Sequence, residues 1–97
     1  MESVKIFDNE AQQQFEIRMD GELATLQYRF YKNDIALMHT HVPEKLEGKG
    51  LATALANYGL EWAKNHNKKI MVYCPFVGSY LKKNPEYNFL VDKNYVK

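Results

Sequence analysis

Two glycines flank a lysine at residues 48–50, directly before the longest stretch of helical apolar periodicity in the chain. A helix that begins after Gly50 has backbone N–H groups without partners in its first turn, and its dipole adds positive potential there. Glycine has no side chain to keep an anion away, and Lys49 adds a positive charge. The segment is therefore suited to hold a phosphate group, although a simple turn of the chain would also use two glycines.

Two familiar phosphate-binding motifs do not match this segment. A P-loop requires the pattern G-x-x-x-x-G-K-[ST], which the sequence lacks. A dinucleotide-binding fingerprint requires a third glycine, where this chain has Thr53. It also requires an acidic residue at the end of the next strand, where Tyr73 and Cys74 stand instead. Both motifs are excluded.

Cys74 is a candidate nucleophile, because it follows a short apolar run that we expect to be a buried strand. Such a thiol could accept an acyl group before an amine attacks it, or it could be a small buried apolar residue. His39 and His41 lie two residues apart in an expected strand and share one face, so either could serve as a base toward Cys74 or toward an amine. Exposed polar side chains are the alternative interpretation of this pair. With no fourth ligand at a recognisable spacing, we expect no metal.

Further candidate bases are Glu44 and Glu47, whose position is also typical of solvated loop carboxylates.

The elements that position these residues begin with strands. Between residues 13 and 42 the apolar side chains alternate with a period near two, as in Phe15, Ile17, Met19, Leu23, Thr25, Tyr28, Phe30, Ile35 and Leu37. Turn signals at Asp20-Gly21 and at residues 32–34 divide this region. The pattern predicts three antiparallel strands.

A long helix is predicted from Leu51, and residues 65–67 are expected to end it. Two stripes at helical spacing give it a broad apolar face: a large one, Leu51, Leu55, Tyr58 and Trp62, and a small one, Ala52, Ala56, Gly59 and Ala63. We expect Asn57, Glu61 and Lys64 on the opposite side. The run at residues 68–74 predicts a strand parallel to the one before the helix. A short helix bracketed by Pro75 and Pro85 follows, and the tail is left unassigned.

The composition narrows the class of protein. The chain has 97 residues, 45% of them hydrophobic, which predicts one domain over residues 1–97 with its own core. Lys and Arg number 13 against 12 Asp and Glu, so the net charge of +1 gives no long-range field for a polyanion. No apolar run approaches the roughly 18 residues of a membrane span. The single cysteine and the start of the sequence favour a cytoplasmic protein, with no membrane partner.

Residues 42–63 resemble the acetyl-coenzyme A-binding segment of the GNAT superfamily of N-acetyltransferases, whose signature is Q/R-x-x-G-x-G/A at a strand-to-helix junction. Here residues 47–52 carry it, with Glu47 in place of Gln or Arg. The order of elements over residues 14–90 is similar to that of a small single-domain subgroup. The resemblance implies a compact α/β (α+β) fold: a mixed antiparallel and parallel sheet, one long signature helix and a short C-terminal helix.

The same resemblance implies that the protein transfers acetyl from acetyl-coenzyme A to a primary amine. Tyr80 is the implied proton donor, with Cys74 and His41 as further catalytic candidates. The implied cofactor-binding residues are Thr40, His41, Val42, Gly48, Lys49, Gly50, Leu51, Ala52, Thr53, Phe76 and Lys83. The acceptor, whether a protein lysine, a protein N-terminus or a polyamine, stays open, as does the oligomeric state.

Two alternatives belong to other functional classes. The domain could bind an acyl-coenzyme A without catalysis. It could also bind single-stranded nucleic acid through a basic surface with aromatic side chains, made by Lys68, Lys69, Lys82, Lys83, Tyr73, Phe76 and Tyr80. The balanced charge makes nucleic acid the less favoured partner.

Overall fold

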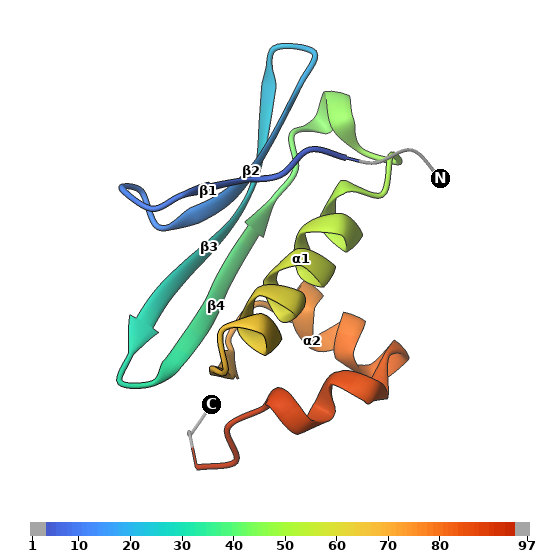
Figure 1. Ribbon diagram of the computed structural model, residues 1–97. Helices are drawn as coiled ribbons and strands as arrows, with labels where there is room; N and C mark the ends of the chain where they lie inside the picture. Colours follow the sequence, from blue (N-terminus) through green and yellow to red (C-terminus); the bar gives the residue numbers. More distant parts are fainter. Residues whose placement is uncertain (1–3, 95–97) are drawn as a thin grey trace.

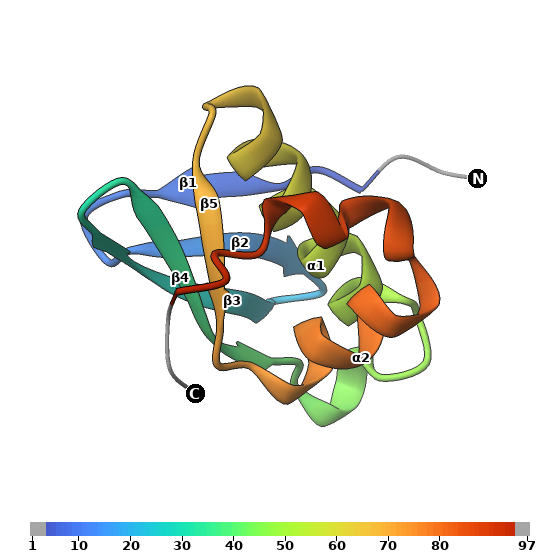
Figure 2. The ribbon, with the colours of Figure 1, turned by 90° about the horizontal axis from the view of Figure 1, so that it is seen from below.

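The computed structural model describes residues 4–94 and has helices packed on one face of a twisted sheet (Figures 1 and 2). The sheet has the order β1-β2-β3-β4-β5. Its strands are β1 (Phe7–Asn9), β2 (Gln14–Met19), β3 (Glu22–Tyr31), β4 (Asp34–His41) and β5 (Lys69–Val72). Neighbouring strands are antiparallel except β4 and β5, which are parallel. The predicted mixed sheet is confirmed, and β1 is a strand that the sequence did not indicate.

The helical elements also follow the predicted order. They are the short 3-10 helix η1 (Glu44–Leu46), the long helix α1 (Leu51–Asn65), the second helix α2 (Pro75–Lys83) and the 3-10 helix η2 (Pro85–Leu90). Pro75 occupies the first turn of α2, where its missing N–H costs nothing. Beyond η2, a bridge between Ile70 and Val91 attaches the unassigned tail to the outer edge of β5. No helix within residues 4–94 is both long and apolar enough to cross a membrane.

Both predicted hairpins are present. Asp20 and Gly21 have φ values of 53° and 75°, as expected for a two-residue turn that matches the twist of the strands. This turn sets the register, in which Ile17 pairs with Ala24 and Phe15 with Leu26. The predicted alternation at the start of β3 is wrong for Leu23, which is 36% exposed, whereas Thr25 is buried, as are its neighbours Ala24 and Leu26.

A β-bulge interrupts the ladder between β3 and β4. Gln27 pairs with His39, but the next residue, Tyr28, pairs with Leu37, so Met38 is an extra residue in β4. A bulge of this kind changes which face the following side chains occupy. Beyond it, Thr40 lies opposite the core residue Leu26 and so belongs to the helix-covered face of the sheet. His39 and His41 belong to the other face and are exposed.

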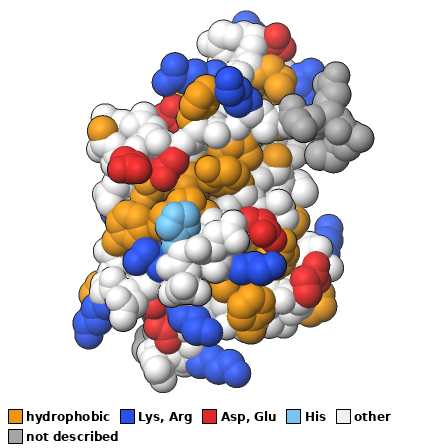
Figure 3. Space-filling view, viewed as in Figure 1, with side chains coloured by type: hydrophobic (Ala, Val, Ile, Leu, Met, Phe, Trp, Pro, Cys, Tyr) orange, Lys and Arg blue, Asp and Glu red, His pale blue; other side chains and the backbone are white. Residues whose placement is uncertain are grey.

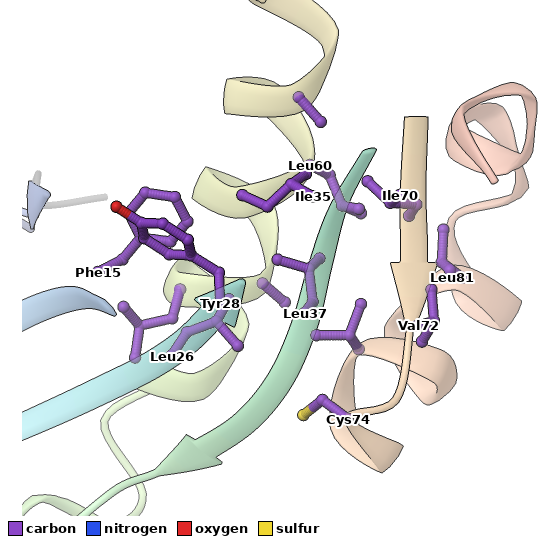
Figure 4. Close-up of a cluster of buried hydrophobic side chains, with 14 of the residues drawn as sticks. Phe15, Leu26, Tyr28, Ile35, Leu37, Leu60, Ile70, Val72, Cys74 and Leu81 are labelled. Carbon is purple, nitrogen blue, oxygen red and sulfur yellow. The ribbon is translucent and has the colours of Figure 1, made fainter. Parts of the chain in front are cut away.

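Helix α1 supplies one side of the core, which Figure 4 shows against β3, β4 and β5. The buried residues of α1 are Leu51, Leu55, Ala56, Gly59, Leu60 and Ala63. They include most of the two predicted stripes, while Leu60 was not predicted and Ala52 lines a surface pocket instead. At its C-terminal end the His66 ring stacks on Trp62, with 4.0 Å between ring centroids. Its Nδ1 lies 2.8 Å from the Trp62 carbonyl oxygen. Figure 3 shows hydrophobic side chains gathered beside a histidine on this side of the molecule.

Candidate active site

Strands β4 and β5 separate at the end of their short parallel ladder. The pairing runs from Asp34 and Lys69 to Leu37 and Val72 and goes no further. The Leu37 carbonyl oxygen then accepts hydrogen bonds from the N–H groups of both Tyr73 and Cys74, each at 3.0 Å. Because β4 bulges at the next residue, Met38, the two strands diverge from this point. The divergence opens the sheet at the carboxyl ends of two parallel strands, where α/β proteins commonly bind ligands.

Cys74 lies at this divergence and contacts Thr40. The Cys74 Sγ and Thr40 Oγ1 atoms are 3.1 Å apart, and Cys74 is 2% exposed. Figure 4 shows its sulfur directed from the start of α2 toward β4. The structure thus brings Cys74 to a neutral hydroxyl, while His41 lies on the opposite face of the strand.

A surface pocket of about 240 Å³ lies at the start of α1. Its lining residues are Val42, Leu46, Glu47, Gly48, Gly50, Leu51, Ala52, Thr53 and Phe76. Most of the predicted cofactor-binding residues therefore line one pocket, together with Leu46 and with Glu47, the first residue of the signature. Thr40, His41, Lys49 and Lys83 are outside this lining. Lys49 is exposed beside the pocket, and Lys83 lies in the last turn of α2.

The two glycines of the signature leave the start of α1 open. Gly48 and Gly50 have φ values of 82° and 77°, in the left-handed region where other residues are strained. A Cβ atom placed on either glycine would meet no protein atom within 4 Å. No side chain caps α1, and its first turn has no acidic residue. The free space and the uncapped N–H groups fit a bound anion such as a phosphate.

A seam of polar contacts between α1 and the C-terminal helices continues from this pocket. Thr53 and Phe76 line the pocket, and one helical turn further along each helix lie Asn57 and Tyr80. The Asn57 Nδ2 donates hydrogen bonds to the Tyr80 hydroxyl oxygen at 3.0 Å and to the Tyr87 hydroxyl oxygen at 3.2 Å. The seam places Tyr80 one turn from the lining of the pocket.

Glu61 completes the seam, because the Tyr87 hydroxyl donates a hydrogen bond to its carboxylate. This hydrogen bond, aided by burial, raises the pKa of Tyr87 to about 12. Asn57 and Glu61, predicted to lie opposite the apolar face of α1, are half-buried because they contact Tyr80 and Tyr87.

A larger cavity, of about 780 Å³, lies on the face of the sheet that the helices do not cover. Ala36, Met38 and Met71 line it, and so do Asp34 and Asp92. Burial and the neighbouring Asp92 carboxyl raise the pKa of Asp34 to about 6, although Lys68 and Lys69 act against the shift. One end of this cavity is at the bulge, so it reaches the divergence of β4 and β5 from the side opposite Thr40.

The lysines of the alternative basic surface lie at two places. The Lys68 and Lys69 ammonium groups lie 5.6 and 6.0 Å from the ring centroids of Phe30 and Phe89, at the start of β5. Lys82 and Lys83 occupy the last turn of α2. Over residues 4–94, no three His, Cys, Asp or Glu side chains come together as a possible metal site.

The fold and the open start of α1 are those of a small α/β domain with a candidate anion site, and comparison with known proteins gives its family. The GCN5-related N-acetyltransferase family matches residues 14–90. The chain belongs to this family.

Individual relatives agree with the assignment. The chain is 29% identical over 86 residues to the protein NATD1 of Xenopus tropicalis, with 86% of this chain and 79% of that protein covered. It is 29% identical to human NATD1 over 85 residues, which cover 84% and 75% of the two chains. The chain also matches a solution structure from Staphylococcus aureus, with a TM-score of 0.70 and 30% identity. That protein is named as a GCN5-like N-acetyltransferase by likeness. That match covers 98% of this chain and 97% of the other.

Proposed function

We propose that this protein transfers the acetyl group of acetyl-coenzyme A to a primary amine. The observation that carries the proposal is the pocket at the start of α1, where Gly48 and Gly50 leave uncapped N–H groups open to an anion. Membership of the GCN5-related N-acetyltransferase family supports the same activity.

The pyrophosphate of coenzyme A would lie at the N–H groups of residues 51–53, where the helix dipole also favours negative charge. Val42 and Phe76 add apolar surface on either side of the pocket. The acyl end of the cofactor would reach the divergence of β4 and β5, next to Thr40 and Cys74. Backbone groups that the bulge removes from the ladder are suited to hold the thioester oxygen there.

The chemistry proposed is direct transfer. The neutral amine nitrogen attacks the thioester carbon, the C–N bond forms, the C–S bond breaks, and the nitrogen loses a proton to solvent or a base. Tyr80 is the proposed donor of a proton to the departing thiolate, since it lies one helical turn beyond Phe76 of the pocket. Cys74 is given no covalent role, because its close contact is with the Thr40 hydroxyl and not with a histidine.

The amine acceptor would approach from the other face of the sheet. The cavity of about 780 Å³ reaches the divergence there through Met38, and the apolar side chains of Ala36 and Met71 continue it along the strands. Cofactor and acceptor would then meet at the divergence from opposite sides, as an in-line attack requires.

A titration followed by backbone amide NMR tests cofactor binding. Acetyl-coenzyme A is expected to shift the amide signals of residues 48–53 and of Cys74. Adenosine alone should leave the amide signal of Cys74 unshifted. Release of coenzyme A in the presence of spermidine or poly-L-lysine then tests transfer. Silence of residues 48–53 at millimolar ligand contradicts the proposal, and binding without turnover makes the domain a non-catalytic acyl-coenzyme A-binding module.

A further inference from the structure

In the polar seam between α1, α2 and η2, each hydrogen bond has a defined donor and acceptor. The Tyr87 hydroxyl gives its single proton to the Glu61 carboxylate. Its oxygen can then only accept from Asn57, so the Asn57 atom facing it must be the amide nitrogen, which lies 3.2 Å away. The carboxylate thus determines which way round the Asn57 amide lies.

The same nitrogen also fixes the orientation of Tyr80. An amide nitrogen has two hydrogens, and the second points at the Tyr80 hydroxyl oxygen at 3.0 Å. Because the Tyr80 hydroxyl oxygen accepts from Asn57, its own proton is not used in that hydrogen bond. The rest of the residue is also held, since the Asn84 side chain donates to the Tyr80 carbonyl oxygen at 2.9 Å.

We propose that Asn57 is a positioning residue for acetyl transfer: it keeps the Tyr80 hydroxyl proton free for the leaving thiolate. This inference rests on the proposed function and on Tyr80 as its acid. The hydrogen bond from Asn57 has a second effect, because it stabilises the negative charge that develops on the Tyr80 oxygen as the proton departs. Glu61 and Tyr87 act through Asn57, by holding its amide in the donating orientation.

The decisive experiment combines two substitutions in a double-mutant cycle. The variants are Tyr80→Phe, Asn57→Leu and the double variant, with coenzyme A release measured using spermidine and poly-L-lysine as acceptors. Loss of a general acid lowers kcat by about 100-fold or more, and Asn57→Leu is expected to lower it by about 10-fold with an unchanged KM for acetyl-coenzyme A. In the Tyr80→Phe background, Asn57→Leu should lower kcat no further, because it acts only through the Tyr80 hydroxyl.

Asn57→Asp is a second variant, of nearly the same size as the original residue, in case Asn57→Leu fails to fold. A carboxylate accepts where the amide donates. The Tyr80 hydroxyl would then donate its hydrogen bond to the new carboxylate and not to the thiolate, so kcat should also fall. Two outcomes overturn the positioning role but leave the proposed function standing. One is wild-type kcat in both Asn57 variants. The other is a loss of kcat by Asn57→Leu that is as large in Tyr80→Phe as in the original protein. Wild-type kcat in Tyr80→Phe overturns the positioning role too. Absence of transfer by the unaltered protein overturns the proposed function, and this inference with it.

Discussion

Gly59 in the middle of α1 packs directly against Leu26 of β3. A Cβ atom on Gly59 would lie 3.2 Å from the Leu26 Cδ2 and 3.6 Å from the Leu37 Cδ2. The small-residue stripe of α1 therefore brings the helix backbone close to the sheet that carries the diverging strands.

Gly59→Ala is expected to destabilise the protein by about 1 kcal/mol, because overpacking costs about 1–3 kcal/mol and the gain in helix propensity returns up to about 1. Gly78→Ala in α2 is the matched control, since its Cβ would come no closer than 3.9 Å to Val72. It should gain about 0.5–1 kcal/mol. Urea unfolding measures both, and an equal change in the two variants would contradict this account of the helix–sheet contact.

Gly48→Ala and Gly50→Ala should reduce both stability and cofactor affinity. The left-handed backbone costs a residue with a Cβ about 1–2 kcal/mol. Shielding of the N–H groups should weaken coenzyme A binding by about tenfold, which equals about 1.4 kcal/mol. Gly21→Ala is the control, because Gly21 has the same kind of backbone, with φ 75°, far from the pocket in the β2–β3 turn. Calorimetric titration should show a loss of affinity in the first two variants only.

Glu47→Gln should bind coenzyme A more tightly than the unaltered protein. The Glu47 side chain lines the pocket at the start of α1, where a negative charge opposes a bound phosphate. Its removal should lower the Kd by about twofold to fivefold, with the larger effect at low salt. Glu44→Gln in η1 removes the same charge from a residue outside the pocket lining. Equal effects of the two substitutions would mean that Glu47 acts only through net charge.

Cys74→Ala should keep acetyl transfer within about threefold of the original rate, because direct transfer needs no thiol nucleophile. Intact-mass spectrometry of the rapidly quenched protein should show no acetyl adduct in the absence of an amine. An adduct that the alanine variant lacks, together with a loss of turnover, would establish the covalent route instead.

Asp34→Asn should stabilise the protein more at pH 7.5 than at pH 4.5. The pKa of Asp34 is raised to about 6, by burial and by Asp92, so its favourable contribution is complete below its ordinary pKa near 4 and is lost as the pH rises through about 6. The pKa of Asp92 is lowered, chiefly by the hydrogen bond from Asp34, so its contribution is lost only as the pH falls below its ordinary value.

Thermal unfolding measures the difference between the Asp34→Asn variant and the original protein across this range. The exposed Asp20 in the first hairpin turn supplies the control for a change in net charge, as Asp20→Asn. A difference in Tm for Asp34→Asn that stays constant from pH 4.5 to pH 7.5 would contradict a raised pKa of Asp34 in the folded protein.

Local patterns were sufficient to predict much of the fold. The Asp20-Gly21 turn and the residues around it predicted the first hairpin, because turn chemistry and alternation are both local. The stripes of α1 predicted most of its buried face, although they left out Leu60. By contrast, the pairing of β1 depends on a partner strand, and three residues have too little periodicity to indicate it.

The seam of Asn57, Tyr80 and Tyr87 could not be predicted in the same way. Asn57 and Glu61 are polar and share a side of α1, a pattern typical of a solvated face. Only the return of η2 across that face makes them half-buried, and this depends on where the chain goes after Pro85. The faces of Thr40 and His41 depended on the bulge, which no local pattern around Met38 indicates.

The bulge at Met38 determines which side chains of β4 lie on the same face of the sheet as Cys74. In a regular strand continuing from Leu37, side chains would alternate without interruption, and His39 and His41 would share the face of Cys74. A thiol beside an imidazole is the pairing that covalent acyl transfer uses. The one extra residue turns both histidines to the opposite face and leaves Thr40 beside the sulfur. A change of pairing by a single position would thus place His39 and His41, in place of Thr40, on the face of the sheet that carries Cys74.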